Sequence, residues 1–265
     1  MGNSPRREVG QWDPTFTKRF KDIAGPLVRR YFRAEVRGIE GIPATGGVLL
    51  VSNHSGGMLT PDVLILAAAY YEHFGYARPL YTLAHSMILL GPLGTVLRRA
   101  GALEASRGNA AHALQNGAAV LVFPGGDYDA YRPTSKANVI DFNGRTGYVR
   151  TALKTGVPIV PAVSIGAQES QLFVSRGSWL AKRLGLNRLR AEIVPITVGF
   201  PFGLSVFAPN IPLPSKVITE VLEPIDVVGL WGPDADVDDV DRHVRTVMQT
   251  ALDALAAKRR LPVIG

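Results

Sequence analysis

A series of short apolar runs, most of them bounded by glycine, proline or polar residues, predicts β-strands along this chain. The runs are rich in valine, isoleucine and leucine, as buried strands of an α/β sheet are. The expected strands are residues 47–52, 80–84, 102–105, 118–123, 157–165, 192–198 and 217–222.

Helical spacing of apolar positions falls between most of these runs, at residues 62–74, 110–116 and 148–155. A longer amphipathic stretch, residues 237–258, predicts a helix docked near the carboxyl end of the chain. Alternation of strands and helices predicts an α/β fold: one domain with a mixed, largely parallel sheet flanked by helices.

The amino-terminal segment has its own pattern. Apolar residues recur there at spacings of three and four, flanked by lysines and arginines, and Pro26 is expected to divide the segment into two short helices. Residues 1–40 are therefore expected to form an amphipathic helical segment, and residues 41–265 the main domain. The apolar stripe either packs on the protein's own core or lies on a membrane. Its members are Phe16, Phe20, Ile23, Leu27 and Tyr31.

Composition narrows the possible classes of protein. With 265 residues, 46% of them apolar, the chain can bury a full core. The sequence has no cysteine, which excludes disulfides, a thiolate nucleophile and a cysteine-bound zinc ion. No apolar run reaches the roughly 18 residues of a spanning helix, and the first residues lack an apolar signal core. These features predict a cytoplasmic protein.

The net charge of +7 is unevenly distributed. Residues 171–190 carry basic side chains and no acid, interleaved with Trp179 and several leucines, a pattern that suits the anionic inner face of a membrane or an ordinary packed helix. Residues 193–215 are uncharged and rich in proline, and they predict a strand followed by an irregular apolar loop. That loop is either a buried connection or a surface that enters lipid. No nucleic-acid recognition motif accompanies the positive charge.

The first candidate for chemistry follows the strand at 47–52. His54 comes directly after its carboxyl end, where open α/β sheets carry their active sites, and Asp62 falls in the first turn of the next helix. Thr60 is expected to cap that helix and Pro61 to be its first residue. A histidine beside a carboxylate can act as a general base; the alternative is a buried, hydrogen-bonded loop histidine.

Three further elements have weaker signals when taken singly. A Gly125–Gly126 turn after the strand at 118–123 would let backbone N–H groups approach a substrate, with Asp127 and Arg132 adding charge, or it is an ordinary tight turn. Arg107, after the strand at 102–105, either binds a phosphate or is solvated. Prolines punctuate the buried strand at 157–161.

In this order, the four elements resemble the blocks of the glycerolipid acyltransferase family, the lysophosphatidate acyltransferase-like enzymes. Asn53-His54 matches the catalytic block, Arg107 the arginine of the second block, and residues 157–161 (Val-Pro-Ile-Val-Pro) the fourth block. The third block appears as Phe-Pro-Gly-Gly at residues 123–126, the form typical of the monoacylglycerol and diacylglycerol acyltransferase branch. With Gly125 in place of glutamate, the resemblance does not imply a phosphate on the acceptor.

The chain departs from the family pattern in the position of its acid. Family members place a carboxylate five positions after the histidine, where this chain has Leu59; the nearest acid is Asp62. A longer turn could return Asp62 to the imidazole ring, or Asp127 or Asp129 could supply the partner.

The resemblance implies an O-acyltransferase of glycerolipid and phospholipid biosynthesis that moves a fatty acyl group from acyl-CoA or acyl carrier protein to a lipid hydroxyl. His54 is the expected base and Asp62 its partner, with no metal and no cofactor beyond the thioester co-substrate. Lipid acceptors also imply a peripheral protein of the inner membrane face. The competing functions are a lipid esterase that uses serine, and a non-catalytic lipid-binding protein on the same fold. Residues expected to contact substrate are Asn53, Arg107, Gly125, Gly126, Asp127 and Arg132.

Overall fold

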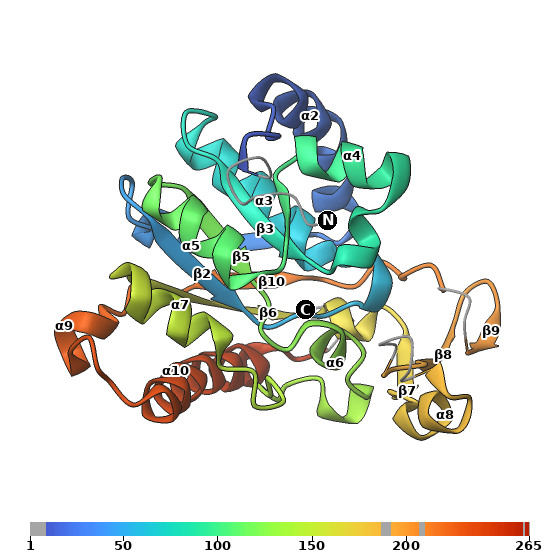
Figure 1. The fold of residues 1–265 in the computed structure, drawn as a ribbon. Coiled ribbons are helices and arrows are strands. Elements are labelled where there is room, and N and C mark those ends of the chain that lie inside the picture. Colours follow the sequence, from blue (N-terminus) through green and yellow to red (C-terminus); the bar gives the residue numbers. More distant parts are fainter. Residues whose placement is uncertain (1–8, 187–191, 207–209, 262, 265) are drawn as a thin grey trace.

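The computed structural model describes residues 9–186, 192–206, 210–261, 263 and 264. Over these residues, seven strands form one sheet in the order β1-β10-β6-β2-β5-β3-β4 (Figure 1). Strands β6, β2, β5, β3 and β4 run parallel to one another, whereas β1 and β10 run antiparallel to them. The strands are β1 (Glu35–Arg37), β2 (Val48–Ser52), β3 (Leu80–Ala84), β4 (Ala102–Glu104), β5 (Ala119–Val122), β6 (Ile159–Ile165) and β10 (Ile218–Val221).

Helices cover both faces of this sheet (Figure 1). The described helices are α2 (Pro14–Tyr31), α3 (Pro61–Phe74), α4 (Gly91–Arg99), α5 (Arg107–Gln115), α6 (Gly126–Ala130), α7 (Gly147–Thr155), α8 (Ser178–Arg183), α9 (Val227–Trp231) and α10 (Val237–Lys258). Five short 3-10 turns occur in the described part of the chain: η1 (Ile39–Gly41), η2 (Gly57–Leu59), η3 (Ser86–Leu89), η4 (Thr134–Lys136) and η5 (Ala167–Glu169).

The central strand β2 is buried along its whole length and divides the core in two. Because successive side chains of a strand point to opposite faces, Leu49 and Val51 join a cluster with α5, α7 and α10. Val48 and Leu50 join a second cluster with α3. The carboxyl end of β2 is therefore held between layers on both sides.

A second, three-stranded antiparallel sheet projects from the main body, at the right in Figure 1. Its strands are β7 (Leu172–Ser175), β8 (Ile196–Gly199) and β9 (Gly203–Ser205), in the order β7-β8-β9. The short helix α8 follows β7.

The structure confirms the predicted fold class and places a strand in each of the seven predicted ranges. The strand expected at 192–198 is shorter, at Ile196–Gly199, and lies in the second sheet. Residues 35–37, placed within the amino-terminal helical segment, instead form β1 and pair with β10. Within the described residues, no helix combines the length and apolar character needed to cross a bilayer.

The prediction that Pro26 splits the amino-terminal helix is wrong, because α2 continues through it. Proline removes one backbone donor inside a helix and leaves the carbonyl four residues earlier without a partner. That carbonyl belongs to Asp22, which is exposed, as is Pro26, so water can satisfy it. The buried alternative for the apolar stripe is also wrong for much of its length, since Phe20, Ile23, Leu27 and Tyr31 are exposed.

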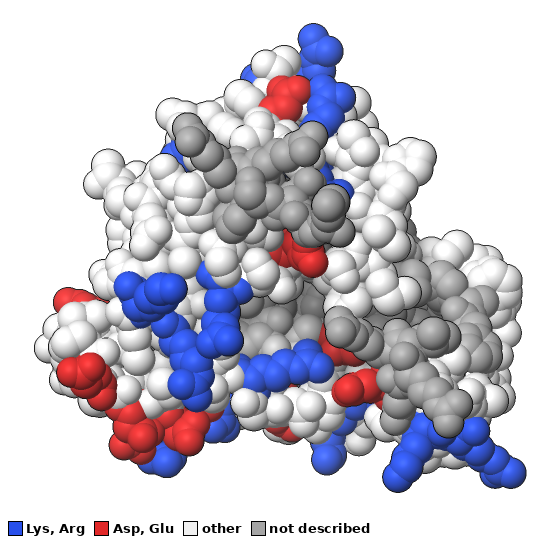
Figure 2. All heavy atoms as spheres, viewed as in Figure 1, with Lys and Arg blue, Asp and Glu red and all other residues white. Residues whose placement is uncertain are grey.

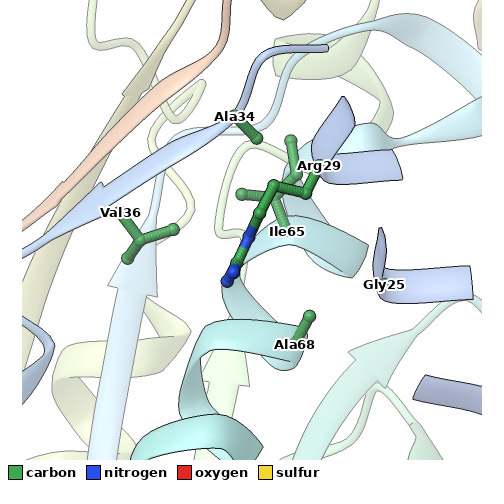
Figure 3. Close-up of a pocket in the computed structure, with 6 residues that line it drawn as sticks. All are labelled: Gly25, Arg29, Ala34, Val36, Ile65 and Ala68. Atoms are coloured by element: carbon green, nitrogen blue, oxygen red, sulfur yellow. The ribbon is translucent and has the colours of Figure 1, made fainter. Parts of the chain in front are cut away.

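A small pocket opens between α2, β1 and α3 (Figure 3). The Arg29 side chain extends into it and donates a hydrogen bond to the Glu72 carboxylate. Its cavity volume of about 10 Å³ is far below the range usual for sites that enclose a small molecule. The lining residues are Gly25, Arg29, Ala34, Val36, Ile65 and Ala68, and none of them belongs to the turn that carries His54.

Candidate active site

His54 follows the carboxyl end of β2, two residues after the strand ends. Asn53, fully buried before it, is held by both of its side-chain polar groups: its Nδ2 donates to the Ser164 carbonyl oxygen at 2.9 Å, and its Oδ1 accepts from the Ser164 amide at 2.7 Å. These bonds tie the end of β2 to β6. Asn53 therefore anchors the turn, with the nitrogen and the oxygen of its buried amide each bonded within the protein.

The imidazole ring of His54 lies against the carboxylate of Asp62, with Nδ1 2.9 Å from Oδ2. Asp62 is buried, and the same Oδ2 accepts the Ser55 amide at 2.8 Å while Oδ1 accepts the Val63 amide at 2.9 Å. Since a carboxylate only accepts, Nδ1 carries the proton of the neutral ring and Nε2 keeps its lone pair. Of the three acids considered from the sequence, Asp62 is the partner of the ring.

Backbone geometry explains how an acid eight positions away reaches the ring. Gly56 and Gly57 have φ angles of 90° and 70°, in the left-handed region that glycine enters without strain. A Cβ atom on Gly56 would lie 2.7 Å from Cδ of Pro61, so the turn folds back on the start of α3. Thr60 also has a positive φ, 36°, and its side chain makes no capping bond, contrary to the expected role. The Asp62 carboxylate bonds the first-turn amide of Val63 instead.

The main chain of His54 is bonded on both sides by a buried ion pair that follows the third sequence block. Asp129 accepts the His54 amide N–H through Oδ2, and Arg132 donates from Nη1 to the His54 carbonyl oxygen at 2.7 Å. Arg132 also bonds the Asp129 carboxylate, and both side chains are almost fully buried. Asp129 is therefore a partner of the His54 backbone and not of its ring. Arg132, expected to contact substrate, is buried, and its Nε and Nη1 bond to Ala137, His54 and Asp129 within the protein.

Gln168, which the sequence reasoning missed, closes this network. Its Oε1 accepts the Gly56 amide at 3.1 Å, and its Nε2 donates to the Arg132 carbonyl oxygen. Gln168 lies in η5, just beyond the carboxyl end of β6. A buried polar residue after the strand adjacent to β2 was the available signal, because neighbouring parallel strands end at the same edge of the sheet.

The His54 side chain is partly exposed to solvent, whereas Asp62 and Phe123 beside it are buried. The His54 side chain is 14% exposed, and the Phe123 ring stacks on it with centroids 4.3 Å apart. Burial acts to lower the pKa of His54, but the charge and hydrogen bond of Asp62, helped by Asp129, raise the pKa above its ordinary value. The ring is therefore more basic than a free histidine.

The Gly125–Gly126 turn begins α6, a short helix not foreseen from the sequence. The Gly126 amide donates to the Phe123 carbonyl oxygen at 3.0 Å, whereas the buried Gly125 amide donates to no acceptor among the described residues. Asp127 is half exposed and pairs with Arg145, whose Nη1 also donates to the Gly125 carbonyl oxygen at 2.8 Å. Arg145 was not singled out from the sequence.

Arg107 is exposed at the first position of α5, directly after the Ser106 cap. Serines flanking His54 do not complete a triad: Ser52 donates to the Asn53 carbonyl oxygen, and in the described contacts the ring's hydrogen-bond partner is Asp62. Across the residues that the structure describes, no group of three or more histidine, aspartate or glutamate side chains is placed to hold a metal ion.

Comparison with known proteins identifies the family of this chain. The family model described as Acyltransferase matches residues 33–165, half of the chain. An uncharacterized protein of Mycobacterium tuberculosis is 34% identical over 260 residues, covering 94% of this chain and 70% of that protein. The mouse diacylglycerol O-acyltransferase 2-like protein 6 is 24% identical over 210 residues, covering 74% of this chain and 61% of its own length.

Among solved structures, the 1-acyl-sn-glycerophosphate (LPA) acyltransferase PlsC from Thermotoga maritima superimposes with a TM-score of 0.56 at 19% identity. The match covers 91% of this chain and 81% of that one, which confirms the fold. The family model spans β2 with His54, the Arg107 and Gly125–Gly126 turns, and β6, the four blocks that carried the resemblance. The chain belongs to the acyltransferase family and is an acyltransferase.

Proposed function

We propose that this acyltransferase moves a fatty acyl group from the thioester of acyl-CoA or acyl carrier protein to a hydroxyl of a glycerolipid, with His54 as general base. The observation that carries this proposal is the 2.9 Å contact between His54 Nδ1 and Asp62 Oδ2. It fixes the tautomer in which Nε2 is the free, proton-accepting nitrogen. Asp62 takes the role of orienting the ring and stabilising the imidazolium that forms.

In the proposed reaction, His54 takes a proton from the acceptor hydroxyl and later gives it to the leaving thiolate. Nε2 of His54 removes the proton of the acceptor hydroxyl as that oxygen attacks the thioester carbonyl carbon. The tetrahedral intermediate carries the negative charge on its oxygen, for which the Gly125 amide is the candidate donor. Collapse of the intermediate breaks the carbon–sulfur bond, and the thiolate receives the proton from His54. The products are the acylated lipid and the free thiol.

Support for a neutral glyceride acceptor comes from two sources. The relatives named as diacylglycerol O-acyltransferase 2, from Dictyostelium discoideum and Danio rerio, are 27% and 29% identical over parts of the chain. At the turn beside His54 the chain also has Gly125, with no acidic or basic side chain at that position. A mono- or diacylglycerol is therefore the first acceptor to test, and a lysophospholipid the second.

The test supplies purified protein with labelled acyl-CoA or acyl carrier protein and a panel of monoacylglycerols, diacylglycerols and lysophospholipids. We expect labelled lipid from the wild type and a loss of at least about a thousandfold for His54→Ala. The matched control is His73→Ala, an exposed histidine at the far end of α3, which should retain wild-type turnover.

Three results would count against this proposal. Free fatty acid as the sole labelled product indicates an esterase, with water as the acceptor. No product from any donor and acceptor indicates a lipid-binding protein without turnover. Wild-type product from His54→Ala would remove the histidine from the mechanism.

A further inference from the structure

The second sheet has its apolar side chains on the outside. In β7, Leu172 and Val174 are each 50% exposed, while Phe173 between them is 1% exposed. In β8 and β9 the polar Thr197 and Ser205 point inward and are buried. An antiparallel sheet with one solvated face normally places polar residues on that face. Here that pattern is inverted.

Strand pairing assembles the outward residues into one row. Leu172 lies opposite Val198, and Val198 lies opposite Leu204. The row continues into the β8–β9 hairpin and onto the next segment, because Phe200 forms a bridge with Ile211 and accepts its amide at 2.7 Å. We call this row the apolar ridge; its members, all exposed, are Leu172, Val198, Phe200, Phe202, Leu204 and Ile211.

Basic charge accompanies the apolar ridge in sequence and in space. Between residues 170 and 219 the only acid of the sequence is Glu192, against Arg176, Lys182, Arg183, Arg188, Arg190 and Lys216. Helix α8, beside β7, exposes Trp179 together with Lys182 and Arg183. Figure 2 shows white atoms over the described part of the lobe of β8 and β9, with blue side chains at the lower right near α8.

The inner face of the same sheet packs against the turn that carries His54. A Cβ atom on Gly57 would lie 3.0 Å from Cε1 of Phe173, so β7 packs directly on η2. The Phe173 amide is fixed from the other side by Thr134 Oγ1 at 2.9 Å. A flat partner resting on the apolar ridge would therefore lie within one sheet thickness of the catalytic turn.

We propose that the apolar ridge is the surface by which the protein docks on an anionic lipid bilayer, with Phe200 and Phe202 at the hairpin entering the lipid and the basic side chains of α8 meeting the headgroups. Charge complementarity selects this occupant. Apolar and aromatic side chains beside lysine and arginine match an anionic interface. A second copy docked through the same face would bring two basic, acid-poor segments together and repel.

This inference deepens the proposed function, since a glycerolipid acceptor resides in the bilayer, but its test needs no turnover. Wild-type protein is floated with vesicles of phosphatidylcholine containing phosphatidylglycerol and with vesicles of phosphatidylcholine alone. We expect binding to the anionic vesicles that weakens in high salt, and weaker binding to the neutral ones. His54→Ala should bind like the wild type, so a failed mechanism and a failed docking surface give different results.

The apolar contribution is tested with Phe202→Ser/Leu204→Ser, which should weaken vesicle binding by about tenfold or more. Leu230→Ser is the matched control: it is 64% exposed, against 69% for Leu204, and lies in α9 at the opposite end of the molecule in Figure 1. It should bind like the wild type. Thermal unfolding of each variant checks that the fold is intact.

The charge contribution is tested with Lys182→Gln/Arg183→Gln, which should weaken binding by about 25-fold at low salt, at roughly fivefold per charge. Arg150→Gln/Lys154→Gln removes the same charge from α7, and should have little effect. The proposal is overturned if the wild type does not bind anionic vesicles, or if the ridge variant binds as the wild type does. It is also overturned if sedimentation shows a dimer that the ridge variant abolishes while vesicle binding persists.

Discussion

The turn that carries His54 and the outer face of the second sheet differ in how their side chains are satisfied. Around His54, the buried amide and charged side chains that shape the turn have partners: Asn53 is paired with Ser164, Asp62 with the ring and two amides, and Asp129 with Arg132. The buried Ser55 hydroxyl is the exception, with no partner among the described residues. On the apolar ridge, large apolar side chains are left in water. The charged groups of the first region are paired within the chain, whereas the apolar side chains of the second remain exposed unless a partner covers them.

This difference matches the two tasks proposed for the regions, catalysis at the turn and docking at the ridge. A preorganised site keeps its geometry through fixed hydrogen bonds, because a reacting group displaced by even 1 Å loses much of its rate advantage. A docking surface needs no such fixity, since hydrophobic burial is non-directional. Substitutions at the turn should therefore change rate and stability, whereas substitutions on the ridge should change vesicle binding alone.

The largest effect is expected from Asp62→Asn. The asparagine keeps the size of the side chain but removes the charge that stabilises the imidazolium and holds the tautomer, so turnover should fall by about 10³–10⁴-fold. Steady-state acyl transfer measures this. Asp234→Asn, an exposed acid without a role in the site, is the control and should leave turnover unchanged.

The Asp62→Asn variant should also shift the pH dependence of activity, in a direction that can be stated. Only neutral His54 is a base, so wild-type activity should rise with pH through the pKa of His54, which Asp62 raises against the effect of burial. Without the Asp62 charge that pKa falls, and the acid limb of the residual activity should move to lower pH. An acid limb that stays in place, or moves to higher pH, would show that Asp62 does not govern the basicity of the ring.

Sequence patterns predicted the elements that local composition determines. Strands β2, β5 and β6 are continuous apolar runs, and buried parallel strands have that composition wherever they pair. Strand β1 was missed because three residues, Glu35–Arg37, carry no apolar run and become a strand only by pairing with β10. Strands β7 and β9 depend in the same way on β8.

The candidate site was predicted only in part, for a related reason. His54 and Asp62 follow from strand and helix boundaries, but their contact depends on the positive φ angles of Gly56, Gly57 and Thr60. Arg132 looked like a solvent-facing contact for substrate because arginine is seldom buried. Its burial depends on Asp129 and the His54 carbonyl, which lies 78 positions away in the chain.

The next largest effect is expected on stability, from Arg132→Met. This change leaves the Asp129 carboxylate buried without its cation and the His54 carbonyl oxygen without that donor, which should lower the free energy of unfolding by about 3–5 kcal/mol. Urea denaturation measures it. Replacing both partners, in Asp129→Leu/Arg132→Met, should recover part of the loss, since no charge is then buried alone.

An exposed ion pair provides the control for that experiment. Arg242 pairs with Asp239 on the surface of α10, and both side chains are more than half exposed. Arg242→Met should change the free energy of unfolding by less than about 1 kcal/mol. Equal losses for Arg132→Met and Arg242→Met would contradict the buried clamp on the His54 backbone.

A smaller loss is expected from Gly57→Ala. The φ of 70° costs an alanine about 1–2 kcal/mol, and the new Cβ would lie 3.0 Å from the Phe173 ring. Gly46→Ala is matched to it, because Gly46 has a φ of 76° and nothing within 4 Å of the added Cβ. The difference between the two losses in the free energy of unfolding isolates the contact between the turn and β7. Equal losses for Gly57→Ala and Gly46→Ala would mean that β7 moves aside at no cost and does not stabilise the turn.

The smallest effect on stability is expected on the ridge itself. Phe202→Ser/Leu204→Ser removes side chains that are already in water, so the free energy of unfolding should change by no more than about 0.5 kcal/mol per site. Phe173→Ala, on the inner face of the same sheet, should lose about 3–5 kcal/mol because it empties a packed position. If the ridge variant is destabilised as much as Phe173→Ala, the ridge side chains stabilise the fold. The contrast between the hydrogen-bonded turn at His54 and the exposed apolar ridge then fails.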